Sequence, residues 1–236
     1  MISPSKQFIT ELTADNSPTL RLKNQDPVKM TTENRPESMH HSGGAATETQ
    51  YIYGEAARLV AQKNTKPAIC VVGLGLGYIE ILMAQIFQNF EIHSFEADSE
   101  LRQSFQDWLE NKKAAHLEIY ELIIQSYQFD SYAIRQKIIK NQLTLHGALD
   151  RQMLQQDFPS FNLICFDAFS SKTTADLWTE DFLDLFIQKI CARDCVFTTY
   201  ACTGVLKRAL KKNGFQLIPK KGFTGKRDCT LAVREN

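Results

Sequence analysis

The hydrophobic positions along the chain fall into short apolar runs separated by longer segments with helical spacing. The run at residues 68–72 (AICVV) is wholly apolar and is bounded by Pro67 and Gly73, as is typical of a buried parallel strand. In residues 77–88 the apolar side chains recur at intervals of three and four, which predicts an amphipathic helix. Strand-like and helix-like segments continue to alternate to residue 213. This alternation predicts a parallel sheet with helices on both faces.

The remaining segments complete an α/β fold. Further strands are predicted at residues 91–95, 143–146, 161–166 and 194–200, and further helices at 99–111, 117–140, 177–190 and 203–213. Two last apolar runs, 215–218 and 229–233, are expected to pair as an antiparallel hairpin. A seven-stranded, mostly parallel sheet with such an antiparallel end is the methyltransferase variant of the doubly wound, Rossmann-like fold, and we expect that fold here.

The N-terminal part follows a different pattern and is rich in Thr, Asn, Ser, Asp and Pro. Residues 15–18 (DNSP) predict a turn between short extended pieces, which indicates a β-hairpin followed by a long loop. Thr47 and Gln50 have the spacing of a capping box, so the first long helix is expected to start near Thr47. We therefore divide the chain into an N-terminal hairpin and loop extension, residues 1–46, and a main domain, residues 47–236.

The composition indicates where in the cell the protein is located and whether it has a metal site. The N-terminus is polar, and no stretch approaches the roughly 18 apolar residues that span a bilayer. The five histidines and six cysteines show no cluster of the convergent ligands that a zinc site needs. We expect a cytoplasmic protein with reduced thiols, no membrane association and no metal site.

Formal charge is balanced over the whole chain but concentrated in one segment. Between Lys207 and Arg234 there are nine basic residues and a single acid, Asp228, which leaves this segment at about +8. A basic segment of this kind favours a polyanionic partner. Solvated surface lysines would give the same pattern, so charge alone leaves both interpretations open.

A glycine-rich segment lies between the first buried strand and the helix that follows it. Gly73, Gly75 and Gly77 allow a sharp turn and a close approach of a ligand to the backbone, beside the helix N-terminus. Glu96 ends the second strand about twenty residues later, where a carboxylate accepts hydrogen bonds from both ribose hydroxyls. The GxGxG spacing favours S-adenosyl-L-methionine over a dinucleotide, whose pyrophosphate needs a later third glycine. We expect the neighbouring acid, Asp98, to cap the next helix instead.

A second acidic residue, Asp167, follows the apolar run 161–166. Ligands of open α/β sheets bind at the carboxyl ends of the strands. A carboxylate at this point can orient the methyl donor or accept a hydrogen bond from an incoming amine. The alternative is a structural cap of the loop that follows the strand.

Several motifs spread over the chain together resemble one known family. They are DNSPTL at residues 15–20, HSGGAATET at 41–49, FDAFS at 166–170, LWT at 177–179, TYA at 199–201 and GFTGKR at 222–227. These segments are similar to those of the MnmC-type tRNA methyltransferases, which complete 5-methylaminomethyl-2-thiouridine at the wobble position. The resemblance extends over most of the chain. Three positions depart from the family pattern, Val71, Ala148 and Ser171, and Ala148 follows the third strand where the family has an aspartate and adenine is bound.

The resemblance implies methyl transfer from S-adenosyl-L-methionine to the aminomethyl group of 5-aminomethyl-(2-thio)uridine in tRNA. The expected cofactor residues are Gly73, Gly75, Gly77, Glu96, Ala148 and Asp167. Asp167 and Tyr200 are the expected catalytic residues, and the expected tRNA contacts are Phe169, Phe223, Lys207, Arg208, Lys226 and Arg227. Better-known members of the family also carry an FAD-dependent oxidoreductase domain that prepares the amine. The resemblance does not include that domain, so we expect a separate oxidoreductase or other amine-forming enzyme to supply the substrate.

Two other functions remain open at this point. Spermidine-synthase-like aminopropyltransferases share the fold, the glycine-rich loop and the acid after the second strand. They need an acidic channel for a polyamine, and the basic C-terminal segment argues against one. The other alternative is a degenerate, non-catalytic methyltransferase fold that binds RNA, and Val71 and Ala148 favour it.

Overall fold

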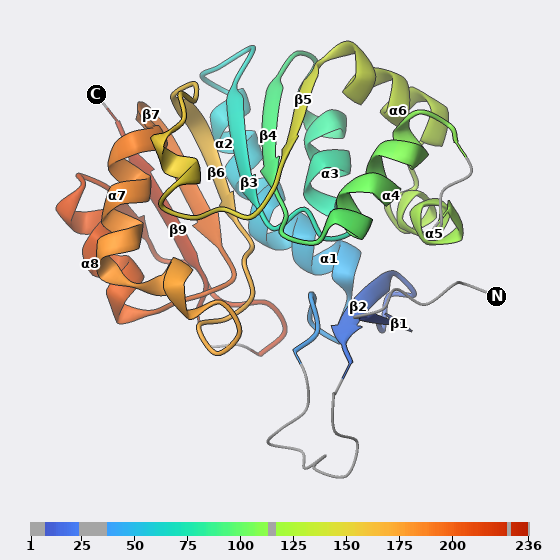
Figure 1. Cartoon of the computed structure of the whole chain (residues 1–236), viewed down its shortest axis with the longest axis horizontal. Coiled ribbons are helices and arrows are strands. Elements are labelled where there is room, and N and C mark those ends of the chain that lie inside the picture. Colours follow the sequence, from blue (N-terminus) through green and yellow to red (C-terminus); the bar gives the residue numbers. More distant parts are fainter. Residues whose placement is uncertain (1–7, 24–36, 113–116, 226–227, 236) are drawn as a thin grey trace, which may run out of the picture.

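The apolar runs of the sequence form the centre of a seven-stranded sheet in the computed structural model, which describes residues 8–23, 37–112, 117–225 and 228–235. Five strands run parallel, and the strand that follows them in space is antiparallel to both of its neighbours. In spatial order they are β5 (Gln142–His146), β4 (Glu91–Phe95), β3 (Ala68–Val72), β6 (Phe161–Phe166), β7 (Cys191–Thr199), β9 (Thr230–Arg234) and β8 (Gln216–Ile218) (Figure 1). The predicted fold class is confirmed, including the antiparallel hairpin at its end.

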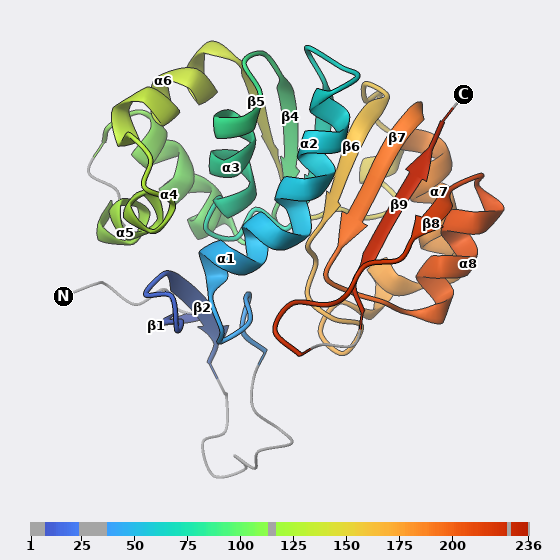
Figure 2. The ribbon, with the colours of Figure 1, turned by 180° about the vertical axis from the view of Figure 1, so that it is seen from behind.

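Helices cover both faces of the sheet because consecutive strand residues point to opposite sides. In β3, Ile69 and Val71 join one apolar core, and Cys70 and Val72 join the other. The first core is completed by α2 (Glu55–Ala61), α3 (Tyr78–Ile86), α4 (Ser99–Leu109), α5 (Leu117–Tyr127) and α6 (Ser131–Lys140), and the second by α7 (Glu180–Ile190) and α8 (Gly204–Lys212). Figure 2 shows the molecule turned by 180° from the view of Figure 1, and in this view α2 and α3 lie in front of the sheet. The short 3₁₀ turns η4 (Met153–Gln155) and η5 (Ala175–Trp178) lie in the connections.

Side-chain caps fix where several helices begin. Asp98 accepts hydrogen bonds from the backbone N–H groups of Glu100 and Leu101, so it caps α4 as expected. Thr179 accepts one from the N–H of Phe182 and starts α7. The helix predicted over 177–190 is therefore two elements, η5 and α7, because a capping residue interrupts the amphipathic pattern.

The N-terminal hairpin is also confirmed. It consists of β1 (Phe8–Leu12) and β2 (Pro18–Leu22), and it lies beside α1 (Ala45–Thr49) (Figure 1). The predicted capping box at Thr47 is wrong, because α1 begins two residues earlier and is capped from the turn of the hairpin. The Thr13 and Ser17 hydroxyls each accept a hydrogen bond from the N–H of Ala45 at 3.0 Å.

Asp15, in the same turn, completes this cap. Its carboxylate accepts hydrogen bonds from the N–H and the hydroxyl of Thr47 at 3.0 and 2.6 Å. Burial acts to raise the pKa of Asp15. The hydrogen bonds that it accepts, with the largest effects from Ser17 and Thr47, nevertheless hold this pKa well below its usual range. A negative charge at a helix N-terminus is itself stabilising.

The helix that starts at Ala45 changes its winding before it continues as α2. Residues Gln50–Gly54 form a π-helical turn, η3, between α1 and α2. Such turns leave backbone carbonyls without their α-helical partners. Here the Ile52 carbonyl accepts a hydrogen bond from the Thr198 hydroxyl at 2.9 Å, and the Tyr51 carbonyl accepts one from the Lys220 ammonium at 2.7 Å.

Glu80, in the first turn of α3, is a fully buried acid on the first core. Its Oε1 accepts a hydrogen bond from the Ser94 hydroxyl at 2.6 Å, and its Oε2 has no hydrogen-bond partner among the described residues. Burial raises the pKa of Glu80 to about 7, against the opposing effect of Ser94. The side chain is therefore a neutral acid below neutral pH.

Within the ranges that the structure describes, no helix has the length and apolar character needed to cross a bilayer. The same ranges contain no group of three or more His, Cys, Asp or Glu side chains arranged to hold a metal ion, and their six cysteines are free thiols.

Candidate active site

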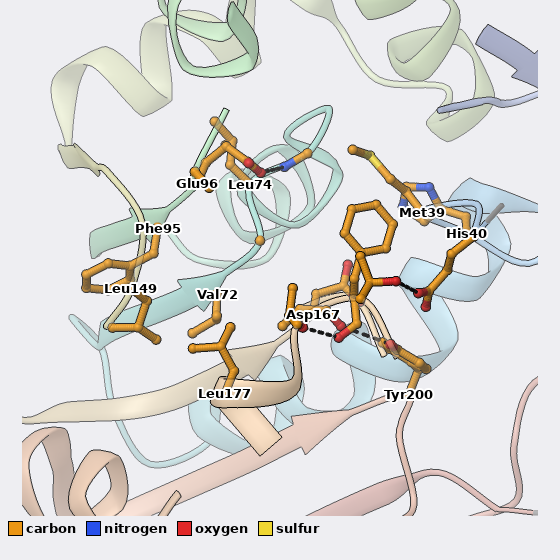
Figure 3. Close-up of a pocket in the computed structure, with 18 of the residues that line it drawn as sticks. Met39, His40, Val72, Leu74, Phe95, Glu96, Leu149, Asp167, Leu177 and Tyr200 are labelled. Carbon is orange, nitrogen blue, oxygen red and sulfur yellow. Dashed lines mark hydrogen bonds between the residues drawn. The ribbon is translucent and has the colours of Figure 1, made fainter. Parts of the chain in front are cut away.

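A cavity of about 1270 Å³ lies at the carboxyl edge of the sheet, where β3, β4 and β6 end. Pockets that bind one small ligand measure roughly 300–1,000 Å³, so there is room for a cofactor and part of a second molecule. Figure 3 shows Glu96 and Leu74 on one side of the cavity, and Asp167 with Tyr200 on another. The sequence prediction of a site at this edge agrees with the position of the cavity.

The three glycines of the glycine-rich segment adopt backbone conformations that other residues avoid. Their φ angles are +95° at Gly73, +51° at Gly75 and +74° at Gly77. A Cβ at Gly73 would lie 2.6 Å from the backbone oxygen of Asp167, and one at Gly77 would lie 2.2 Å from the ring of Phe105. Glycine is thus required both for the turn and for close packing.

Glu96 is held in place by the backbone around it. Its Oε2 accepts a hydrogen bond from the N–H of Gly75 at 3.0 Å, and its Oε1 accepts one from the N–H of Asp98 at 2.9 Å. Burial raises the pKa of this carboxyl, while those two hydrogen bonds act to lower it. The glutamate is therefore fixed at the edge of the cavity beside the glycine-rich segment, where a ribose diol would meet it.

An apolar wall adjoins Glu96. It is formed by Val72, Phe95 and Leu149, and Ala148 lines the cavity next to them (Figure 3). Aromatic and aliphatic walls suit the faces of an adenine ring. The residues present therefore fit the predicted cofactor, with the glycine-rich segment as a cradle, Glu96 for the ribose and this wall for the base. Val71, which departs from the family pattern, is fully buried in the first core and does not line the cavity.

Asp167 lies at the other part of the cavity, directly after β6. Its backbone N–H donates to the carbonyl of Val72 at 2.7 Å, and its carboxylate Oδ1 accepts a short hydrogen bond from the hydroxyl of Tyr53. Tyr200 is next to it, and its hydroxyl donates to the carbonyl of Ala168 at 2.9 Å. Burial, and then the charge of Asp167, raise the pKa of Tyr200, so this phenol is neutral.

The lining of the cavity is strongly acidic. Among the described residues it contains one arginine, Arg151, two histidines and no lysine. The acidic residues of the lining are Glu11, Glu37, Glu48, Glu96, Asp150, Asp167 and Asp176. This local charge is opposite to that of the C-terminal segment, and it suits a cationic ligand.

The segment 37–41 closes the cavity on the side opposite the sheet, and the residue pattern had not predicted this. Glu37 accepts hydrogen bonds from the N–H and hydroxyl of Ser170 and from the hydroxyl of Thr173, at 2.8 to 3.0 Å. Met39 approaches the glycine-rich segment so closely that a Cβ at Gly75 would lie 3.2 Å from its sulfur. The motif at 41–49 marked this region only through the family resemblance.

The residues expected to contact tRNA are divided between the cavity and the C-terminal segment. Phe169 lines the cavity. Phe223 is only 8% exposed, and its ring contacts those of His41 and Tyr51. These two contacts join the C-terminal loop to the segment before α1, through His41, and to η3, through Tyr51.

Two of the four basic residues of this group, Lys207 and Arg208, are described by the structure, and neither lines the cavity. Lys207 and Arg208 are on α8, outside the described lining, and Arg208 pairs with Glu180 at 3.0 Å. Lys226 and Arg227 fall outside the residues that the structure describes.

Lys220 is one of the nine basic residues of the C-terminal segment, but its side chain is buried against η3 rather than exposed to a polyanionic partner. Its side chain is 5% exposed, and its ammonium contacts Glu55 at 2.7 Å and lies over the ring of Tyr51. Lys220 therefore stabilises η3 from a distant segment of the chain. Lys221, beside it, has a side chain that is 84% exposed.

Known proteins match the chain in sequence. A sequence model of a family described as S-adenosyl-L-methionine-dependent methyltransferase matches residues 110–235, more than half of the chain. An uncharacterised protein of Methanocaldococcus jannaschii is 26% identical over 202 residues, which are 86% of this chain and 55% of that protein. The tRNA 5-methylaminomethyl-2-thiouridine biosynthesis bifunctional protein MnmC of Campylobacter hominis is 22% identical over 196 residues, which are 78% of this chain and 28% of that protein. The chain thus spans about half, or less, of the length of these two relatives.

Solved structures match the fold. MnmC2 from Aquifex aeolicus has a TM-score of 0.68 at 21% identity, over 98% of this chain and 72% of that one. Spermidine synthase from Thermotoga maritima has a TM-score of 0.52 at 12% identity, over 97% and 72% of the two chains. At these identities both matches show the fold alone. The family match over more than half of the sequence shows that the chain belongs to the S-adenosyl-L-methionine-dependent methyltransferases, with S-adenosyl-L-methionine as its cofactor, and its sequence is similar to the MnmC proteins.

Proposed function

We propose that the chain methylates the aminomethyl group of 5-aminomethyl-(2-thio)uridine at the wobble position of tRNA. The observation that carries this proposal is the acidic lining of the cavity, which includes Asp167. An amine is attracted there by opposite charge, whereas a carboxylate or phosphate acceptor would be repelled. The relatives named MnmC are described as tRNA 5-methylaminomethyl-2-thiouridine biosynthesis proteins, and they support the same acceptor.

Asp167 and Tyr200 have different roles in this proposal. S-adenosyl-L-methionine supplies an electrophilic methyl group, which the amine nitrogen takes as the bond to sulfur breaks. Only the neutral amine has the lone pair that attacks, so the bound ammonium first loses a proton to Asp167 or water, and methyl transfer then leaves the product nitrogen as an ammonium. The carboxylate of Asp167 holds the amine in line by accepting an N–H hydrogen bond. Tyr200, a neutral phenol bound to the carbonyl of Ala168, fixes the backbone beside Asp167 and excludes water.

A tRNA substrate requires contacts outside the acidic cavity. The proposed phosphate contacts are Lys207, Arg208, Lys226 and Arg227, and Lys221 joins them because its side chain is exposed. Phe169 is the proposed stacking partner for the unstacked base, since it lines the cavity. Phe223 supports the loop between these basic residues through its buried contacts with His41 and Tyr51. The proposal also implies a cytoplasmic location and a separate oxidoreductase or other enzyme that forms the amine.

Transfer of labelled methyl groups to tRNA tests this proposal. The substrate is tRNA that carries 5-aminomethyl-(2-thio)uridine but lacks its methyl group. After the reaction the tRNA is digested, and its nucleosides are analysed by mass spectrometry. We expect the mass of the aminomethyl nucleoside to increase by one methyl group. Labelled methyl elsewhere in the tRNA, or none in it, would overturn the proposal.

The acidic cavity also favours a second candidate, an aminopropyltransferase, because a polyamine is cationic. The same preparation is therefore assayed with decarboxylated S-adenosylmethionine and putrescine. Turnover of this pair, without methylation of tRNA, would favour the second candidate. Calorimetry that detects no binding of S-adenosyl-L-methionine would instead favour the degenerate RNA-binding fold.

A further inference from the structure

The buried hydroxyl of Tyr53 is directed at Asp167 from a different part of the chain. Tyr53 lies in η3 and is 2% exposed, and its hydroxyl donates to Oδ1 of Asp167 across a separation of 114 residues. The residue pattern had not marked this tyrosine. Its contact nevertheless reaches the carboxylate on which the proposed function depends.

The π-helical turn is what brings Tyr53 to this point. A π turn inserts an extra residue into a helix and rotates the side chains that follow, and such turns are frequent at functional sites. In this protein two side chains stabilise the turn. The hydroxyl of Thr198, near the end of β7, donates to the Ile52 carbonyl, and the ammonium of Lys220, after β8, donates to the Tyr51 carbonyl. The distortion is therefore part of the fold, with its displaced carbonyls satisfied by buried partners.

We infer that Tyr53 is a positioning residue for Asp167, held in place by the π-helical turn and by Thr198. This inference rests on the proposed function, in which Asp167 holds the acceptor amine. A hydrogen bond to the carboxylate restricts its rotation, and it also favours the ionised form that attracts the amine.

The protonation state of Tyr53 agrees with this role. Burial, and then the charge of Asp167, raise the pKa of Tyr53 well above its usual range. The phenol is therefore always a donor to Asp167 and does not accept the proton of the amine.

The test compares Tyr53→Phe with the unaltered protein in single-turnover methylation of tRNA at saturating cofactor. Loss of the hydroxyl is expected to lower the rate constant by about 10- to 100-fold, as for a hydrogen bond to a charged group. The acid limb of the pH–rate profile is expected to move to higher pH, because a carboxylate without that bond is protonated more readily. Affinity for S-adenosyl-L-methionine, measured by calorimetry, should change by less than about twofold, since Glu96 and the glycine-rich segment keep their contacts.

Two further variants complete the experiment. Tyr120→Phe removes an equally buried hydroxyl outside the cavity lining, and it should leave the rate and the pH profile unchanged. Thr198→Val keeps the shape of the side chain but removes the donor to Ile52, so it should reproduce the slower rate and the displaced acid limb in smaller measure.

The outcomes separate the inference from the function on which it rests. If the unaltered protein methylates the wobble amine and Tyr53→Phe does so at the same rate and with the same pH profile, the inference is wrong while the proposed function stands. A slower Tyr53→Phe with an unmoved acid limb also contradicts it, since a merely structural role would give that result. If the unaltered protein transfers no methyl group to tRNA, the proposed function fails and the inference fails with it.

Discussion

Replacement of Glu80 by glutamine tests how a buried acid affects stability. Glu80→Gln keeps the size of the neutral acid and an oxygen that can accept the hydrogen bond from Ser94. It removes the ionisable proton. The free energies of unfolding of the two proteins should therefore differ only at pH values where Glu80 is ionised in the unfolded or the folded chain.

The magnitude follows from the pKa of Glu80, which burial raises from 4.5 to about 7. Between these values the folded protein retains a proton that the unfolded chain has lost, so the free energy of unfolding falls as the pH rises through this window. The loss amounts to about 3 kcal/mol by pH 8, at about 1.4 kcal/mol for each pH unit. Glutamine carries no such penalty. Glu80→Gln should thus be more stable at pH 8 by as much as about 3 kcal/mol, with little difference near pH 4.5.

Urea denaturation at pH 5, 6, 7 and 8, followed by the fluorescence of the buried Trp108 and Trp178, measures this effect. Glu118→Gln is the control, because Glu118 is an exposed residue of α5, and its effect should stay within about 0.5 kcal/mol at every pH. A difference between Glu80→Gln and the unaltered protein that does not vary with pH would refute the reasoning. So would a Glu80→Gln protein that is less stable at pH 8.

Three other predictions follow from the site and its supports. Glu96→Gln should weaken the binding of S-adenosyl-L-methionine by roughly 10- to 100-fold in calorimetry, because a charged acceptor is lost; a change below threefold would argue against the ribose contact. Gly77→Ala should lower the free energy of unfolding by about 2–3 kcal/mol, because its Cβ would lie 2.2 Å from the ring of Phe105 at a φ of +74°; urea denaturation measures the change, and an unaltered midpoint would contradict it. Lys220→Met should lower the Tm by several degrees, as expected for about 2 kcal/mol, while Lys221→Met should leave it nearly unchanged; equal effects of the two variants would show that the burial of Lys220 is unimportant.

The sheet and the cofactor side of the site were predictable because their signals are local. The apolar runs and the glycine-rich segment are each contained in a few neighbouring residues, and Glu96 follows directly on a strand. The structure brings Gly73, Gly75 and Glu96 to one cavity, while Gly77 packs against Phe105 outside its lining. Asp98 was also predicted correctly as a helix cap, since an N-cap acts on the two or three residues that follow it.

The rest of the site depends on contacts between distant segments. The cap of α1 comes from the hairpin turn about thirty residues earlier, so the local capping box at Thr47 was misleading. No local pattern in the sequence marks Tyr53, because its hydrogen bond to Asp167 joins residues 114 positions apart and the turn that holds Tyr53 is supported by Thr198 of a distant strand. The division of the chain at residues 46 and 47 stays a prediction.

The position of β9 has a consequence for the order in which the protein assembles during synthesis. β9 follows β8 in the chain but lies between β7 and β8 in the sheet. In a nascent chain that has reached only β8, the edge of β7 and the edge of β8 that β9 will cover therefore both lack a neighbour. Residues 230–234 must leave the ribosome before either edge is covered, so β7, β9 and β8 pair in one step. A translational pause or premature stop after β8 would expose both edges to aggregation, although most of the core residues would already be present.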